Sequence, residues 1–176
     1  MSLDKAALAQ RFMALDETKQ AVFLQKLGEK GIPFERLPIV AGDRPNRIPL
    51  APAQQRLWTI HQLEPDNTAY HLIAAFELNG MLDVSRLLRA LDAVVQRHES
   101  LRTRFMEEGG EGLQQIGNDS LIVEQRDARG LDDNARQTLA DEHAHRLFVL
   151  GSDSPLRVQL LQLSDQGWRL QLVMHH

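Results

Sequence analysis

The sequence has no cysteine among its 176 residues. Disulfide bonds and thiolate chemistry are therefore excluded. Long apolar runs are missing too: no segment approaches the roughly 20 residues that cross a bilayer, and the N-terminal stretch MSLDKAALAQRF lacks the apolar core of a signal peptide. These absences predict a cytoplasmic protein without membrane contact.

Charge of one sign is not concentrated in any segment. The 20 Lys and Arg residues and the 24 Asp and Glu residues are interspersed, and the formal net charge is −4. A nucleic-acid surface needs a basic stripe because it contacts many phosphates at once, so we expect no nucleic-acid partner. The motifs HExxH, GxSxG, the Walker loop and the glycine-rich dinucleotide loop are absent from the sequence, which leaves metal and nucleotide chemistry without support.

The first patterned segment predicts a helical hairpin. Apolar residues at helical spacing predict a helix over 3–15, and Asp16 is placed to cap a second helix that ends near Gly31. Five of the seven prolines then fall between residues 33 and 52. Because proline fixes φ and lacks a backbone donor, this stretch is predicted to be an extended linker.

These patterns divide the chain into three parts. Residues 1–40 are predicted to form a helical leader or docking-like segment, residues 41–48 a proline-containing linker, and residues 49–176 the main domain. Helical and strand patterns alternate in the main domain, which predicts a mixed α/β (α+β) fold with some antiparallel pairing.

The main domain has three predicted helices and six predicted strands. The first helix is predicted at 52–63 and the third at 132–147. The second begins after the N-cap Asp83 and has an apolar stripe that includes His98. The strands lie at Leu72–Leu78, Leu101–Phe105, Leu113–Ile116, Leu121–Glu124, Leu156–Leu163 and Trp168–His176. The run Leu72–Leu78 is dense in apolar residues, so we expect it to be largely buried.

Histidines are the natural candidates for chemistry, because their side chains titrate near neutral pH. His143 and His145 lie two apart on a predicted helix and point in different directions, so they cannot chelate one metal, and we place both on a solvated face. His61 and His71 are isolated and are interpreted as packed or surface residues. His98 is most simply a core histidine whose hydrogen bonds are satisfied.

The pair His175-His176 differs because it ends a predicted apolar strand. Adjacent strand residues face opposite sides, so one histidine can enter a cavity while the other packs into the fold. The position of the pair is consistent with a functional site. It is equally consistent with a strand end that frays into solvent or with the remainder of a cut affinity tag. The residues taken alone therefore indicate a mixed α/β domain with one candidate histidine site.

Three segments stand out: LAPAQQRLW at 50–58, RHESLRTRF at 97–105 and MHH at 174–176. They resemble the core motifs of nonribosomal peptide synthetase condensation domains, of the chloramphenicol acetyltransferase-like superfamily. Leu50–Trp58 (LAPAQQRLW) is similar to the first motif, and Arg97–Phe105 (RHESLRTRF) matches RHExLRTxF, the second, at each defined position. The end of the chain, Met174-His175-His176, is similar to the start of the third motif, MHHxxxDG. The resemblance covers about residues 48–176.

Two departures from the family pattern matter. Ala51 takes the place of a serine that would cap the first-motif helix, which weakens a helix end without touching chemistry. The chain ends at His176, inside the third motif, so the resemblance implies an N-terminal fragment: most of the first lobe of a two-lobed fold whose active site lies in a tunnel between lobes. We expect this fragment to be inactive by itself.

The resemblance also implies an activity. The family joins carrier-protein-tethered groups in secondary-metabolite pathways that make siderophores or antibiotics: the amine of an aminoacyl thioester attacks a donor acyl or peptidyl thioester and forms an amide bond. His176 matches the catalytic histidine, which positions the amine or removes its proton, and His175 matches its structural neighbour. The second-motif residues with an implied structural role are Arg97, His98, Glu99, Arg102 and Arg104.

The implied partners are the peptidyl carrier protein domains upstream and downstream and the adenylation domain of the parent synthetase. Substrates are carried on phosphopantetheine, and no cofactor or metal is expected to bind directly. Alternatives are an epimerisation domain, which shares the histidine motif, a docking or interaction module that uses residues 1–40, and an inactive gene fragment. The histidine pair argues against a heterocyclising domain, which carries an aspartate pattern there.

Overall fold

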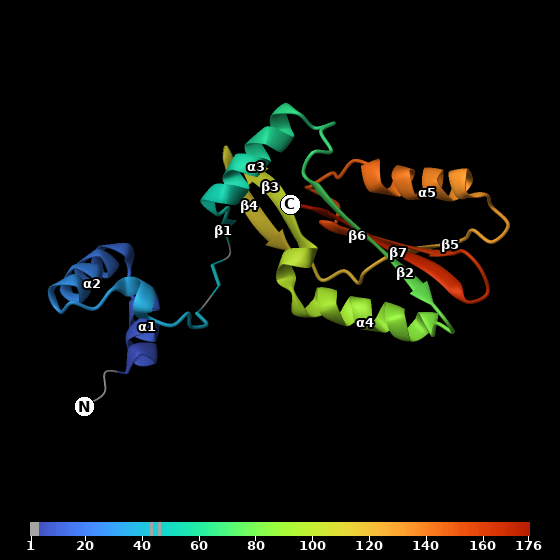
Figure 1. Cartoon of the computed structure of the whole chain (residues 1–176). Coiled ribbons are helices and arrows are strands. Elements are labelled where there is room, and N and C mark those ends of the chain that lie inside the picture. The colour runs from blue at the N-terminus through green and yellow to red at the C-terminus, as the bar shows by residue number, and fades with distance from the viewer. Residues whose placement is uncertain (1–3, 43, 46) are drawn as a thin grey trace. The chain divides into compact units, whose positions relative to one another are not determined.

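The structure is a computed structural model that describes residues 4–42, 44–45 and 47–176. Its contacts divide the chain into two compact units, Met1–Asn46 and Arg47–His176 (Figure 1). No helix within the described ranges is long and apolar enough to cross a membrane.

The first unit contains the predicted helical hairpin. Its helices are α1 (Lys5–Met13) and α2 (Glu17–Glu29), and a 3-10 turn, η1 (Phe34–Arg36), follows them. Asp16 caps α2 as predicted, because its side chain accepts a hydrogen bond from the Lys19 N–H at 2.9 Å. Gly31 follows the helix with a φ of 64°, the left-handed conformation that favours glycine.

Some predictions for this unit differ from the structure or concern residues outside the described ranges. Residue 3 of the helix predicted at 3–15 lies outside the described residues, as do residues 43 and 46 of the predicted linker. The proline-containing stretch is not extended throughout, since the 3-10 turn η1 interrupts it. A two-residue strand near its end, β1 (Ile48–Pro49), is extended. The role of residues 1–40 stays a prediction.

The second unit is a mixed α/β structure, as predicted. Its helices are α3 (Pro52–Leu63), α4 (Val84–Arg97) and α5 (Asp133–His145), with a 3-10 turn, η2 (Glu99–Arg102), after α4. Its remaining strands are β2 (His71–Asn79), β3 (Thr103–Glu108), β4 (Glu111–Ile116), β5 (Val123–Asp127), β6 (Leu156–Gln162) and β7 (Gly167–His175). The predicted strand Leu101–Phe105 thus begins two residues late, because Leu101 and Arg102 belong to η2.

The strands form two sheets. One has the order β1-β4-β3 and the other the order β2-β7-β6-β5. Only the β5–β6 pair is parallel among the paired strands of the described residues, and the last two predicted strands form the antiparallel pair β6–β7. Helices α4 and α5 cover opposite faces of the four-stranded sheet (Figure 1).

The core lies mainly on β6 and β7. On the α4 side, Val158, Leu160 and Leu170 are buried together, and Leu87 and Leu91 of α4 pack against them. On the other side, Phe148 and Leu150, which follow α5, pack with Val173 of β7. The end of β7 is therefore held between two packed layers.

Strand β2 is where the fold departs most from expectation. Most of its residues are exposed, including Leu72 at 46%, Ile73 at 48% and Phe76 at 50%. The predicted strand is present, but the prediction that it is largely buried was wrong. Among the described residues it pairs with β7 alone and is the edge of its sheet, so its apolar composition does not bring burial here.

Candidate active site

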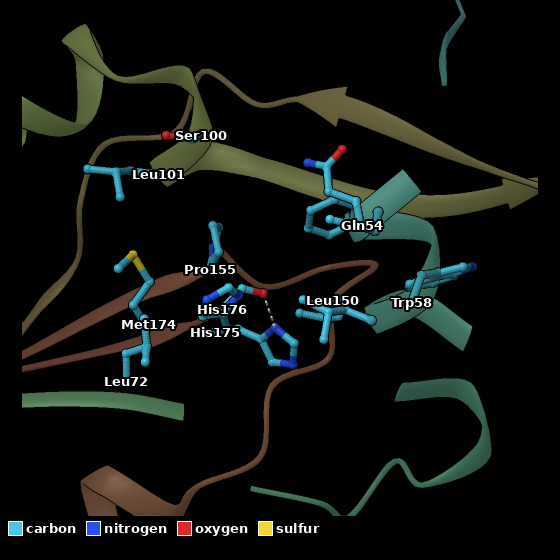
Figure 2. A pocket seen from close by; sticks show the side chains of 13 residues that line it. Gln54, Trp58, Leu72, Ser100, Leu101, Leu150, Pro155, Met174, His175 and His176 are labelled. Carbon is cyan, nitrogen blue, oxygen red and sulfur yellow. Dashed lines mark hydrogen bonds between the residues drawn. The ribbon is translucent and has the colours of Figure 1, made fainter. Parts of the chain in front are cut away.

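The three motif-bearing segments line one pocket of about 390 Å³ (Figure 2). Helix α3 contributes four lining side chains, among them Trp58, and the segment of η2 and β3 contributes three, among them Leu101. The end of β7 contributes Met174, His175 and His176. Apart from the two histidines, the lining is mostly apolar.

Local sequence explains how α3 reaches this pocket. Pro52 occupies the first turn, where its missing N–H costs nothing, and the Gln54 side chain accepts a hydrogen bond from the Ala51 N–H at 2.8 Å. Gln54 also donates to the Gln114 side chain on β4 at 3.3 Å. The helix is thereby tied to the small sheet, with Trp58 on its pocket-facing side 6.4 Å from the Phe105 ring.

The backbone of the histidine pair is held on both sides. His175 lies opposite His71 in the antiparallel register of β2 and β7. The His175 N–H donates to the carbonyl of Pro155 at 2.9 Å, and the His176 N–H donates to the carbonyl of Tyr70 at the same distance. Neither histidine is therefore at a frayed strand end.

The side chains of the pair differ in their surroundings. The His175 ring is half-buried, and burial lowers its pKa from the ordinary value of 6.5. The His176 side chain is exposed and also lines a smaller neighbouring pocket of about 280 Å³, together with Arg56 and Tyr70. Both histidines line the main pocket, so an exposed and a shielded imidazole lie side by side there.

Second-motif residues lie behind the pocket and hold its wall. Arg102 donates to the carbonyls of Gly117, at 2.6 Å, and Gln96, at 3.3 Å. Arg104 forms an ion pair with Asp119. The Glu99 carbonyl accepts from the Thr103 hydroxyl at 2.7 Å.

The bonds to Gly117 and Asp119 join η2 and β3 to the loop that follows β4, and the bond to Gln96 joins η2 to α4. Arg97 is the exposed last residue of α4. The four motif residues Arg97, Glu99, Arg102 and Arg104 are not among those that line the main pocket.

Two histidines are placed differently from expectation. His98 was expected in the core, but it follows the last turn of α4 as its C-cap and is exposed, because the chain leaves the helical path there. His143 was expected on a solvated face, yet it is only 3% exposed. Helix α5 turns His143 and the small residues Ala140 and Ala144 towards the sheet, while His145 is exposed as predicted.

Two histidines without a predicted functional role also lie at the site. The rings of His61 on α3 and His71 on β2 lie 5.7 and 6.2 Å from the His175 ring, centroid to centroid. The one available signal was the Trp58-to-His61 spacing, which puts both rings on one face of the first-motif helix. Among the described residues, no three His, Asp or Glu side chains are grouped as metal ligands.

The chain matches a known protein family. The family model of the condensation domain matches residues 45–176, which include all three motif segments around the pocket. The chain belongs to the condensation-domain family. The mixed α/β fold inferred for this family member is thereby confirmed.

Curated relatives of this condensation-domain segment are synthetases. A component of the linear gramicidin synthase of Brevibacillus parabrevis is 36% identical over 97% of this chain and 3% of its own length. Phosphinothricin tripeptide synthetase PhsC of Streptomyces viridochromogenes is 36% identical over 96% of this chain and 16% of its own length. The chain thus spans a small part of each relative.

Solved structures agree with the condensation-domain fold. The X-domain from teicoplanin biosynthesis, solved in complex with OxyB, is 32% identical with a TM-score of 0.68, over 77% of this chain and 29% of that one. The starter condensation domain of rhizomide synthetase RzmA has a TM-score of 0.69 at 22% identity, over 75% of this chain and 34% of that one. The second likeness concerns the fold alone.

Proposed function

We propose that this segment supplies the histidine-bearing wall of a condensation site in a nonribosomal peptide synthetase. The site forms an amide bond between a donor acyl or peptidyl thioester and an acceptor aminoacyl thioester. One observation carries the proposal: three motif segments far apart in the sequence line a single pocket, and His176 is at its rim with an exposed side chain.

In the proposed reaction the acceptor amine attacks the donor thioester carbonyl. The C–N bond forms, the C–S bond breaks, the amine loses a proton, and the thiol of the donor carrier leaves with a proton. Both substrates are proposed to be carried on phosphopantetheine of peptidyl carrier domains, with an adenylation domain in the parent synthetase. The segment itself is proposed to bind no cofactor or metal directly.

His176 is proposed to act mainly by placing the amine. An α-amino group has a pKa of about 7.7–8.0, so on the order of a tenth of it is already free at neutral pH. Supplying the rest is worth only about 1.4 kcal/mol, whereas correct orientation and hydrogen bonding in the transition state are worth more. His175 is proposed as its structural neighbour, and the second-motif residues as supports of the pocket wall.

The test uses a complete condensation domain that contains this segment. We expect His176→Ala to reduce amide formation between carrier-bound substrates by about 100-fold, since misplacing a reacting group by about 1 Å costs on that order. The exposed His145 provides the control, and His145→Ala should retain the rate. Wild-type activity in His176→Ala would overturn the proposal.

The pH–rate profile separates the two roles of His176. Placement predicts no histidine-like ionisation limb in the profile of the wild-type domain. A clear limb near neutral pH that disappears in His176→Ala would show that His176 removes the proton instead.

A second candidate function is recruitment of a partner protein without catalysis. It is favoured by the 32% identity to the X-domain, whose structure was solved with OxyB bound. A complete domain that binds a partner but forms no amide with any carrier-bound pair would support it. Residues 1–40 are a separate candidate for docking to an upstream synthetase. The test is binding of a peptide of residues 1–45 to the purified carrier-protein terminus of that synthetase, and no binding would argue against docking.

A further inference from the structure

Helix α5 covers its face of the four-stranded sheet with small residues and a histidine rather than with large apolar side chains. Its buried residues are Ala140, His143 and Ala144. On the opposite face of the sheet, Leu87 and Leu91 of α4 pack against the apolar core (Figure 1). Burial stabilises by about 25 cal/mol per Å² of apolar surface, and small side chains bury little of it, so α5 is held less firmly than α4.

The part of the sheet beneath the middle of α5 is polar. Alternate residues of a strand share a face, and on β6 and β7 this face carries Gln159 and Gln171, which are 2% and 4% exposed. The Gln171 amide donates to the carbonyl of Ala140 at 3.1 Å. The Gln159 side-chain oxygen is buried without a hydrogen-bond partner among the described residues, and contact with water would remove that cost.

Pockets lie on both sides of α5. One, of about 450 Å³, is lined by residues of α5, β5 and β6, including His143 and Gln159. The other, of about 340 Å³, is lined by residues of α5, β2 and β7, including Ala140 and Gln171. Atoms that border a gap lose packing contacts on that side, so the helix gains less from the sheet than a closely packed one would.

The segment that follows α5 is held independently of the helix. Arg157 of β6 donates to the carbonyl oxygens of Arg146 and Leu147. Its guanidinium also lies 3.8 Å from the centre of the ring of Phe148, which is buried. A separation of α5 from the sheet can therefore end at Arg146 and leave the following residues in place.

The imidazole of His143 makes this interface sensitive to pH. Burial is the main cause that lowers the pKa of His143 to about 4, and the cations of Arg146 and Arg157 add to it. Glu124 and a bond to Gln171 act in the opposite direction. Once exposed to water, His143 would have the ordinary pKa of about 6.5. Acid therefore favours the separated helix, because between about pH 6.5 and pH 4 only the exposed ring binds the proton.

The groups around His143 also include both signs of charge. The charged and titratable side chains on the elements packed at this interface are Glu124 and Arg126 of β5, Arg157 of β6, Arg169 of β7, His71 and Glu77 of β2, and Asp141, Glu142, His145 and Arg146 in or directly after α5. A variant of His143 itself is therefore needed to isolate its contribution.

We propose that α5 separates from the sheet as a whole while the rest of the second unit stays folded, and that a proton on His143 favours the separated state. The separation breaks the 3.0 Å hydrogen bond between His71 Nδ1 and the carbonyl oxygen of Ala144. His71 lies opposite His175 on the neighbouring strand, so the opening reaches the edge of the histidine site. Its effect on amide formation rests on the proposed function, whereas the separation itself does not.

The test is amide hydrogen exchange of the full chain, followed by mass spectrometry at pH 7 and pH 5 and corrected for intrinsic exchange rates. Local separation predicts that the amides of residues 138–145 exchange through an opening that low concentrations of urea do not promote. The amides of α4 and β6 should exchange through a rarer opening that urea does promote, because it exposes much more surface.

The variants isolate the proton on His143. In the wild type the opening constant of α5 should rise roughly 20-fold from pH 7 to pH 5, as a pKa of about 4 in the packed helix and about 6.5 in the separated helix predicts. His143→Gln and His143→Leu bind no proton there and should lose most of this rise. If one of them does not fold, the other decides. His145→Gln, at an exposed site on the same helix, should keep the rise.

A further variant separates weaker packing from titration. Arg136 of α5 donates to the carbonyls of Ala128 at 3.2 Å and Leu163 at 3.0 Å. Arg136→Ala removes these bonds, so α5 should open more often at both pH values while the rise between them stays the same.

The proposal is overturned if α5 exchanges through the same urea-promoted opening as α4 at both pH values. It also fails if folded His143→Gln or His143→Leu keeps the full rise, or if His145→Gln loses it. None of these readouts requires amide formation, so a failure of the proposed function would leave them unchanged.

Discussion

His143 is on the buried face of helix α5, with 3% of its surface exposed. Gln159 and Gln171, paired across β6 and β7, are also buried, and each has a side-chain oxygen without a partner among the described residues. Burial lowers the pKa of His143 to about 4, and the nearby cations of Arg146 and Arg157 contribute. This histidine therefore stays neutral in the folded chain well below pH 6.5.

The lowered pKa of His143 makes stability depend on pH. Between about pH 6.5 and pH 4 the unfolded chain binds a proton at this residue and the folded chain does not. The free energy of unfolding therefore falls as the pH falls through this window, by on the order of 1 kcal/mol per pH unit.

We expect His143→Leu to remove this contribution. Urea unfolding at pH 7 and pH 5, followed by tryptophan fluorescence, should show that the variant loses about 1–2 kcal/mol less stability on acidification than the wild type. His145→Leu changes an exposed histidine on the same helix and should behave like the wild type. Equal pH dependence in His143→Leu and wild type would contradict the assignment.

At the scale of single elements, the ends of α3 and α4 differ in a way that the sequence shows directly. Asp83 caps α4, and its side chain accepts from the Arg86 N–H at 2.9 Å. At the same position of α3, Ala51 has the extended backbone of an N-cap but no side-chain acceptor. Gln54 supplies only the reciprocal half of a capping box.

Ala51→Ser should complete that box. The serine oxygen would accept from an N–H of the first turn, and we expect a gain of about 0.5–1 kcal/mol in the free energy of unfolding by urea. Asp83→Ala is the matched opposite and should lose about 1 kcal/mol. No gain in Ala51→Ser would mean that water already satisfies the first turn of α3.

At the scale of the whole molecule, the four-stranded sheet of the second unit has an apolar edge strand, β2. One side of β2 pairs with β7, and the opposite side has no paired strand among the described residues. Phe76 of this strand is 50% exposed, whereas Leu78, two residues on and on the same face, packs against the buried cluster of Val158, Leu160 and Leu170. An exposed apolar edge of this kind promotes association between chains.

Phe76→Lys should lower self-association without unfolding the chain. Analytical ultracentrifugation should shift towards monomer, while the free energy of unfolding changes by less than about 1 kcal/mol, as for most exposed sites. Leu78→Lys places the same charge against the core and should cost roughly 1–3 kcal/mol. Unchanged association in Phe76→Lys would show that the edge of β2 is not the contact.

Local patterns were sufficient to predict most elements. Residues 52–63 form the predicted helix to the residue, because Pro52 marks its first turn, and Asp16 and Asp83 both cap the helices assigned to them. The last two strands also lie within one residue of the bounds predicted for them. Capping, turn formation and apolar periodicity depend on neighbours within a few positions, so they can be read along the chain.

Burial and the composition of the pocket depended on the tertiary structure. The apolar run of β2 is exposed because it lies at a sheet edge, and His143 is buried because α5 turns it towards β6 and β7. The motifs identified the histidine pair, but His61 and His71 reach His175 only through the position of α3 and the pairing of β2 with β7. Those contacts join residues about a hundred positions apart, and no local pattern records which distant side chain will lie opposite.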